Sequence, residues 1–184
     1  MKTTAVADAA RNVSRRVGET LRRQQTEYSG EQDRPLGGYV RLMGVYGGMC
    51  AALALAARAT GATLPERFAA ADLALISVAT HRLSRMVSKD PVTSPLRSPF
   101  TRYQQTGGPS ELAEQARGDS PVRHSVGELL TCPFCTAQWI ATGFVAGLVL
   151  APRPTRAVAS VFATVAASDF LQFAHAAAER AAEG

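Results

Sequence analysis

A chain of 184 residues is long enough for one domain, or for a compact core with tails. Its formal net charge is +5, its hydrophobic residues make up 46%, and its aromatic residues make up only 7%. No module of interleaved aromatic and basic side chains is visible, so no nucleic-acid partner is expected, and the positive charge favours anionic lipid headgroups instead.

Residues 1–36 form the first predicted element, a basic cytoplasmic tail or surface helix. Five apolar residues recur at the spacing of an amphipathic helix: Val6, Ala10, Val13, Val17 and Leu21. Because this apolar stripe is thin, weak docking on a membrane and a solvated tail both remain open. Residues 29–38 predict a linker, and no cleavable signal peptide is expected because the first residues lack an apolar region.

The rest of the chain, residues 37–184, predicts an all-α integral membrane helical bundle of about four spans. Residues 129–152 carry no charge, and this run exceeds the roughly 20 residues that a helix needs to cross a bilayer. The four predicted spans are residues 39–59, 67–87, 130–151 and 156–177. The alternative is a soluble, Ala-rich helical bundle.

The basic residues indicate how such a bundle is oriented. Arginines and lysines concentrate in the tail and around the predicted cytoplasmic loop 88–128. The two short connections hold only Arg58, Arg67, Arg153 and Arg156. Positively charged loops stay in the cytoplasm, so both termini are expected there, in a multi-pass membrane protein with the lipid bilayer as its first partner.

Small and ionisable residues inside the spans indicate packing. Gly44 with Gly48, and Gly143 with Gly147, lie four residues apart and allow close helix contact, within the chain, in a homo-oligomer or with another membrane protein.

Asp72 and Asp169 are expected to face the bundle interior, because a charge at bilayer depth is costly. His81 and Arg82 are candidate partners for them, as is His175. A proton or ion pathway would use such a set, whereas the alternative is that both carboxylates cap or pair near helix ends.

The loop 88–128 is expected to be extended or turning, because Pro91, Pro95 and Pro99 recur every fourth residue. A short helix is predicted over residues 110–116, capped by Ser110.

The basic side chains of Arg97 and Arg102, with Lys89, are candidate contacts for a phosphate or carboxylate, because arginine favours planar anions. The alternative is that they are solvated or face lipid headgroups.

The sequence Cys-Pro-Phe-Cys at residues 132–135 admits three interpretations. In a redox site, Cys132 near a helix start would be the stabilised thiolate, Pro133 would fit the first turn, and Cys135 would resolve the mixed disulfide. In a zinc site, the two thiols would supply two of four ligands, with His124 or His81, or a second copy of the chain, completing the set.

In the third interpretation the two thiols and the proline only shape the entrance of a helix. Ser125 and Glu128 have the spacing of a capping box, which predicts a short helix before Pro133 and a kink between the two helices. A cytoplasmic position keeps thiols reduced. Cys50, in the first span, is expected to pack as a small hydrophobic residue.

Three blocks of the sequence stand out together. Residues 127–135 read Gly-Glu-Leu-Leu-Thr-Cys-Pro-Phe-Cys, residues 81–102 run from His-Arg-Leu-Ser-Arg to Ser-Pro-Phe-Thr-Arg, and residues 168–170 read Ser-Asp-Phe. Together they resemble a family of small uncharacterised bacterial membrane proteins, catalogued as domain of unknown function 1360, some of whose members are labelled sporulation proteins. The resemblance implies a multi-span membrane protein and carries over no catalytic residues. Gln138 stands where a more apolar residue is expected.

The leading functional expectation is therefore a structural or interaction role in the bacterial inner (plasma) membrane, with a homo-oligomer as one form of it. The first alternative is a membrane thiol oxidoreductase that uses Cys132 and Cys135. The second is a metal-stabilised membrane module that uses the same thiols with His124 and zinc.

Overall fold

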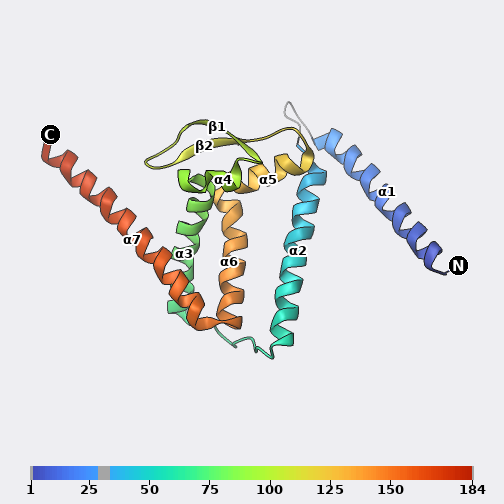
Figure 1. The fold of residues 1–184 in the computed structure, drawn as a ribbon, viewed down its shortest axis with the longest axis horizontal. Helices are drawn as coiled ribbons and strands as arrows, with labels where there is room; N and C mark the ends of the chain where they lie inside the picture. The colour runs from blue at the N-terminus through green and yellow to red at the C-terminus, as the bar shows by residue number, and fades with distance from the viewer. Residues whose placement is uncertain (1, 29–33, 184) are drawn as a thin grey trace.

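The computed structural model describes residues 2–28 and 34–183, and most of them are helical (Figure 1). Residue 1 of the predicted tail and residues 29–33 of the predicted linker lie outside this part. The elements in chain order are α1 (Lys2–Tyr28), α2 (Leu36–Ala59), α3 (Ala70–Lys89), η1 (Pro91–Thr93), α4 (Ser94–Arg97), β1 (Thr101–Thr106), β2 (Leu112–Ala116), α5 (Pro121–Thr131), α6 (Pro133–Leu150) and α7 (Pro152–Glu183).

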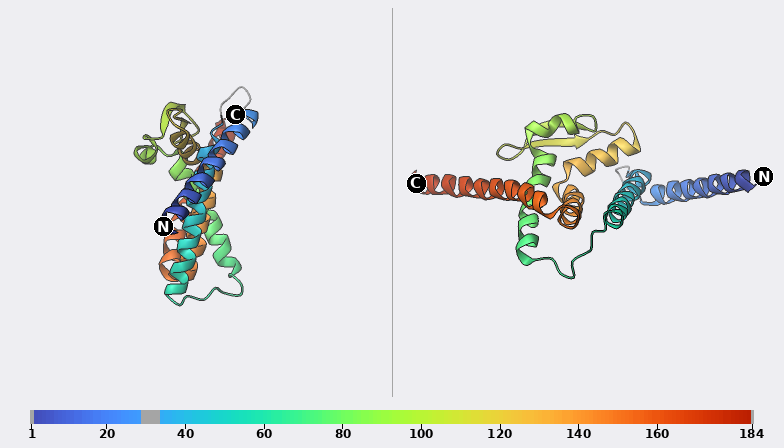
Figure 2. Two further views of the ribbon diagram at one scale, coloured as in Figure 1. Left: turned by 90° about the vertical axis from the view of Figure 1, so that its right-hand side faces the viewer. Right: turned by 60° about the horizontal axis from the view of Figure 1, so that its bottom comes forward.

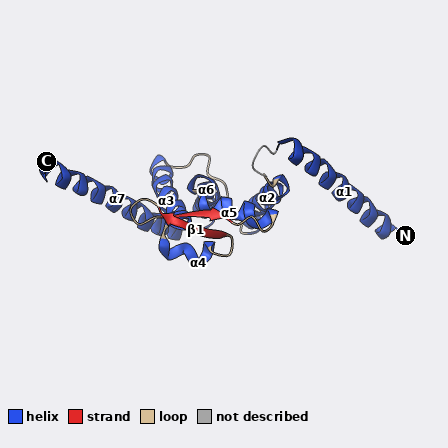
Figure 3. Cartoon of the chain, turned by 90° about the horizontal axis from the view of Figure 1, so that it is seen from above, coloured by secondary structure: helices blue, strands red, loops and turns tan. Residues whose placement is uncertain are grey.

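The long helices run up and down between two ends of the molecule. α2 descends, α3 ascends, α6 descends and α7 ascends at an incline, so α2 begins and α7 ends on the same side (Figure 1). Residues 90–131, which we call the cap, lie across that same end. Seen from above, α1 and α7 extend in opposite directions away from the centre (Figures 2 and 3).

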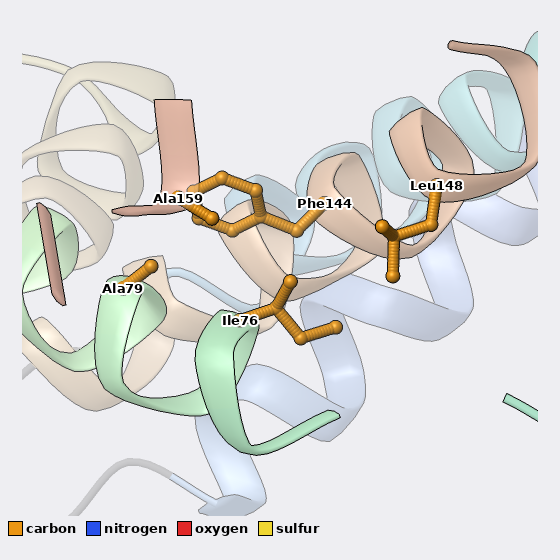
Figure 4. Packing of buried hydrophobic residues seen from close by; sticks show 5 residues of the cluster. All are labelled: Ile76, Ala79, Phe144, Leu148 and Ala159. Atoms are coloured by element: carbon orange, nitrogen blue, oxygen red, sulfur yellow. The ribbon is translucent and has the colours of Figure 1, made fainter. Parts of the chain in front are cut away.

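The apolar core lies where α3 meets α6 and α7. Ile76 and Ala79 of α3 are buried against Phe144 and Leu148 of α6 and Ala159 of α7 (Figure 4). The two alanines are fully buried, which lets the helix backbones approach closely. α3 is therefore the central helix of the bundle.

The glycines expected to mediate helix packing behave differently from one another. A Cβ at Gly147 would lie 2.6 Å from the hydroxyl of Thr155, so Gly147 permits the tight contact between α6 and α7. Gly44, Gly48 and Gly143 have no atom of another part of the described chain within 4 Å of their Cβ positions, so their faces of α2 and α6 are open toward the described residues.

Within residues 2–28 and 34–183, three helices are long and apolar enough to cross a membrane: α2, α6 and α7. None of the most apolar stretch of α2 is buried inside the molecule, and only 17% and 11% of those in α6 and α7 are. α3, expected as the fourth span, is not in this set because it carries charges along its length.

The expectation of an all-α chain needs a correction in the cap. β1 and β2 form an antiparallel hairpin with a bulge between Tyr103 and Gln105. The helix predicted over residues 110–116 is wrong, because Leu112–Ala116 is strand β2 and Ser110 occupies the turn with a φ of 58°. The β-branched and aromatic residues of β1 offer a strand partner, and this pairing outweighs the helix propensity of the second segment.

Prolines begin helical turns in the cap instead of enforcing extended chain. Pro91 is the first residue of η1, Pro95 is the second of α4, and Pro121 is the first of α5. Proline is tolerated there because the first N–H groups of a helix have no partner in the helix. The N-cap of α5 is Ser120, whose hydroxyl accepts from the N–H of Arg123, and not Ser125, which is buried.

A buried ion pair joins the pieces of the cap. Arg97 is fully buried and donates through Nε (2.7 Å) and Nη2 (3.0 Å) to the two carboxylate oxygens of Glu114 on β2. Its remaining donors reach the carbonyls of Val87 (2.8 Å) and Asp90 (3.1 Å) and the hydroxyl of Thr93 (2.6 Å). Five N–H groups thus bond to the end of α3, η1 and β2 at once.

Substituting Gly127 tests the contact between α5 and the hairpin. A Cβ at this position would lie 2.5 Å from the carbonyl oxygen of Phe100 and 2.8 Å from Cβ of Ala116. We expect Gly127→Ala to lower the free energy of unfolding by about 1–3 kcal/mol because the backbones must separate. Thermal unfolding in detergent measures the loss. Gly143→Ala is the control, because its open position predicts no loss; equal losses in both variants would contradict the contact.

Candidate functional site

The two thiols of the Cys-Pro-Phe-Cys sequence lie at the junction between α5 and α6. Cys132 is the residue between the helices and acts as the N-cap of α6, with Pro133 at the first helical position. Its Sγ accepts from the N–H of Cys135 at 3.3 Å, and the thiol of Cys135 donates to it at 2.7 Å. The N–H and the thiol of Cys135 are thus both directed at Cys132 Sγ.

The junction is held by hydrogen bonds on one side and exposed on the other. The hydroxyl of Thr136 donates to the carbonyls of Leu129 (2.8 Å) and Cys132 (3.0 Å) and is 3.1 Å from the hydroxyl of Ser88 on α3. Cys132 is half-buried, Cys135 is exposed, and Phe134 between them is 89% exposed. The thiols therefore sit on a fixed turn with an exposed aromatic ring beside them.

Glu128, one turn before the thiols, contacts three side chains, those of Arg34, Tyr39 and His124. Arg34 donates to its Oε1 at 2.6 Å, and the hydroxyl of Tyr39 donates to its Oε2. The pKa of Arg34 is raised, first by a hydrogen bond with Tyr39 and then by the charge of Glu128. Glu128 thereby fastens the beginning of α2 to α5.

His124 faces this carboxylate. Its Nε2 is 3.4 Å from Oε1 of Glu128, and that buried nitrogen makes no hydrogen bond in the described structure. Among residues 2–28 and 34–183, no group of three His, Cys, Asp or Glu side chains lies close enough to hold a metal ion. The described residues therefore do not bring Cys132, Cys135 and His124 together as the zinc site of the second interpretation.

Gln138 has a partner that sequence reasoning missed. Its amide donates to the hydroxyl of Tyr46 on α2 at 2.8 Å, and the same hydroxyl is 2.8 Å from that of Thr142. The ring of Tyr46 also packs edge-on against Trp139 at 5.1 Å. A polar side chain at residue 138 is thus satisfied between α2 and α6. Cys50 on α2 is half-buried and carries a free thiol.

Each of the two carboxylates expected inside the bundle contacts an arginine. Asp72 accepts two hydrogen bonds from Arg156, both of 2.7 Å, across the α3–α7 contact. Oδ2 of Asp169 is 3.0 Å from Nε of Arg82, whose Nη2 is 3.3 Å from Asp90. Sequence reasoning considered Arg82 but missed Arg156.

The two histidines that were expected as partners of these carboxylates lie elsewhere. His175 lies 3.3 Å from Glu179, one turn farther along α7. His81 is exposed and lines a cleft between α3, the turn of the hairpin and α7, together with Arg82 and Asp169.

The two arginines expected to bind an anion differ. All five donors of Arg97 are engaged inside the cap, so none remains for an external anion. Arg102 is 67% exposed and lies 3.9 Å from Asp119, so an anion role for it stays a prediction.

Sequence reasoning also missed the carboxylates of the hairpin. Glu111 accepts from Nε of Arg85 at 3.0 Å and from its Nη2, and Glu114 accepts from Arg97. Both fall in the segment that was predicted as a helix. The one available signal was the pair of acidic residues three positions apart in the middle of the loop.

Comparison with known proteins gives a family and one named relative. Over 72 residues the chain is 36% identical to "Sporulation protein YjcA" of Bacillus subtilis (strain 168), which is 38% of this chain and 60% of that protein. The chain thus spans less than two thirds of that relative. No solved structure matches the chain. Residues 75–175, more than half of the chain, match the family described as "Protein of unknown function (DUF1360)", and the protein belongs to that family.

Proposed function

We propose that this protein is a multi-pass protein of the bacterial plasma membrane with a structural or interaction role. In this proposal α2, α3, α6 and α7 span the bilayer, and both termini and the cap lie in the cytoplasm. The observation that carries it is that almost none of the apolar stretches in α2, α6 and α7 is buried inside the molecule. Apolar surface of this extent on long helices is stable in lipid and unfavourable in water.

The proposed fourth span depends on shielding of α3. Its apolar residues form the core with α6 and α7, and its first-turn carboxylate, Asp72, is paired with Arg156. Pairing is the usual state of an ionisable residue in a membrane bundle. α3 is 20 residues long, so at 1.5 Å per residue it extends about 30 Å, which matches the apolar thickness of a bilayer.

The distribution of charge supports the proposed orientation. The capped end carries most of the basic residues outside α1: Arg34, Arg82, Arg85, Lys89, Arg97, Arg102, Arg117 and Arg123. The opposite end carries Arg58, Arg67, Arg153 and Arg156. An excess of lysine and arginine marks the cytoplasmic side.

The cap is the proposed surface for interaction. Val92 and Leu96 are 89% and 67% exposed beside the ion-paired centre of the cap, and Tyr103 on β1 is also exposed. A folded surface that is held by a buried ion pair and exposes apolar side chains is suited to contact with another protein.

A second candidate function is thiol–disulfide exchange, favoured by the 2.7 Å separation of the two sulfur atoms and by the N–H directed at Cys132. The Cys132 thiolate would attack a disulfide of a partner and release one thiol, leaving a mixed disulfide. Cys135 would then displace the second partner thiol, so that the partner is reduced and the Cys132–Cys135 pair is oxidised.

Membrane placement is tested by fractionation. The untagged protein should stay with membranes through high salt and alkaline carbonate and should enter solution only with detergent, because its apolar helices would otherwise face water. Recovery in the soluble fraction without detergent would contradict the proposal.

Orientation is tested in the same cells by labelling single cysteines in a variant whose own cysteines are replaced by serine. Thr63→Cys, in the connection between α2 and α3, should react with an impermeant maleimide in intact cells. Gln104→Cys, on the exposed bulge of the cap, should react only after permeabilisation. Reaction of Gln104→Cys in intact cells would invert the orientation.

The exchange reaction is tested with glutathione disulfide as the probe. Cys135→Ser should accumulate a glutathione adduct on Cys132, because the resolving thiol is gone, and mass spectrometry measures it. Cys132→Ser should form at least about tenfold less adduct, since the N–H of Cys135 is directed at the sulfur of Cys132. Cys50→Ser is the matched control and should behave as the unchanged protein. Equal adducts on Cys132→Ser and Cys135→Ser would exclude the assigned roles.

A further inference from the structure

A cleft of about 420 Å³, lined by charged and apolar side chains, lies between α3, the hairpin turn and α7. Arg82 and Arg85 line it from α3, Ser110 and Glu111 from the turn, and Asp169 from α7. Two phenylalanines of α7 complete the wall. The cleft therefore joins a charged interior to an apolar rim.

Charges of both signs alternate across the cleft. Arg82 lies between Asp90 and Asp169, at 3.3 and 3.0 Å, and Arg85 binds Glu111 through Nε and Nη2. Two guanidinium groups thus face three carboxylates, with the exposed His81 beside them. A simple anion would meet the carboxylates and a simple cation would meet the arginines, so neither matches the whole lining.

Some of this polar capacity is unused within the described residues. Nε of Arg82 is buried and close to Asp169, but it is not aligned for a hydrogen bond. The side chains of Asp169 and Arg85 are 41% and 43% exposed. A ligand can therefore reach an acceptor on α7 and a donor on α3 without first breaking a buried pair.

The turn that closes the cleft has an unusual backbone. Ser110 has a φ of 58°, in the left-handed region that non-glycine residues seldom adopt. The hydrogen bonds between Gly107 and Glu111 and between Gly108 and Glu111 hold it in place. Such a strained residue in a cleft wall is often part of a binding site.

The level of the cleft places it at the membrane surface if α3 spans the bilayer, as proposed above. Arg82 and Arg85 lie seven and four residues before the end of α3, or about 10 and 6 Å below it at 1.5 Å per residue. Val165 and Val161 lie four and eight residues before Asp169 on α7, and so deeper in the proposed bilayer, and are 38% and 61% exposed. A charged head in the cleft would therefore have apolar surface beside it for acyl chains.

We propose that the cleft binds the phosphoethanolamine headgroup of a membrane lipid, an inference that rests on the proposed membrane function. The phosphate lies against Arg85 and His81, and the primary ammonium lies against Asp169 and Glu111. A primary ammonium has three N–H donors for carboxylates, whereas a quaternary choline has none. The acyl chains follow Val165 and Val161 along α7 toward the centre of the bilayer.

The test uses the full chain purified in detergent and native mass spectrometry, with phosphatidylethanolamine, its mono- and dimethylated forms, and phosphatidylcholine as probes, all with the same acyl chains. We expect affinity to fall stepwise with methylation, by at least about tenfold over the series, because charge-assisted hydrogen bonds are lost. Equal affinity across the series, or tighter binding of phosphatidylglycerol, would overturn the proposal.

Two further arms separate the source of the headgroup and the contribution of the cleft. Glycerophosphoethanolamine, which has no acyl chains, should compete at least about tenfold more weakly than the lipid, and equal competition would exclude a lipid ligand. Asp169→Asn should reduce the preference for ethanolamine over choline to about twofold or less. Asp119→Asn, an exposed aspartate on the cap, is the matched control and should keep the preference.

Failure of this inference is distinguishable from failure of the proposed function. A protein that needs detergent for extraction but shows no headgroup preference contradicts only the lipid site. A protein that is soluble without detergent contradicts the membrane function first. Unchanged helical circular dichroism of Asp169→Asn shows that a lost preference reflects the site and not the fold, whereas a preference retained in the folded variant contradicts the assigned carboxylate.

Discussion

The rest of the structure depends on the ion pair between Arg97 and Glu114. Both side chains are almost entirely removed from solvent, at 0% and 4% exposure, and the cost of burying them is offset only because every N–H of the arginine has an acceptor. Removing either partner leaves the other buried and unpaired, which is the strongest way to destabilise such a site. Glu114 lies 17 residues after Arg97, and the guanidinium also bonds to the Val87 carbonyl of α3, so the pair joins α3 to the hairpin. The hairpin in turn contacts α5 at Gly127.

This cap fixes the geometry of the two candidate sites. α5 ends at Thr131, so its position sets Cys132 and the start of α6, where Thr136 also contacts Ser88 of α3. On the other side of the cap, the hairpin turn brings Glu111 to Arg85 and closes the cleft against α7. A polar, ion-paired structure at one end of exposed apolar helices is the arrangement expected where a membrane bundle meets the cytoplasm.

Periodicity and charge predicted the helices well but not the cap. Uncharged runs identify α2, α6 and α7, because the signal for a long apolar helix is local in sequence. The hairpin depends on pairing between segments that contain ordinary helix formers such as Leu112 and Ala113, so its strands were missed. The thiol motif was visible in the sequence, whereas the contacts of Glu114, Arg156 and Tyr46 were not, because each partner lies far away along the chain.

The most direct test of this account is a double-mutant cycle on Arg97 and Glu114, measured by reversible unfolding in detergent. Arg97→Met and Glu114→Met should each lower the free energy of unfolding by about 3–5 kcal/mol, since each leaves one buried charge unpaired. The double variant should lose at least about 1 kcal/mol less than the sum of the two single losses. Additive losses, or single losses below about 1 kcal/mol, would contradict the central role of this pair.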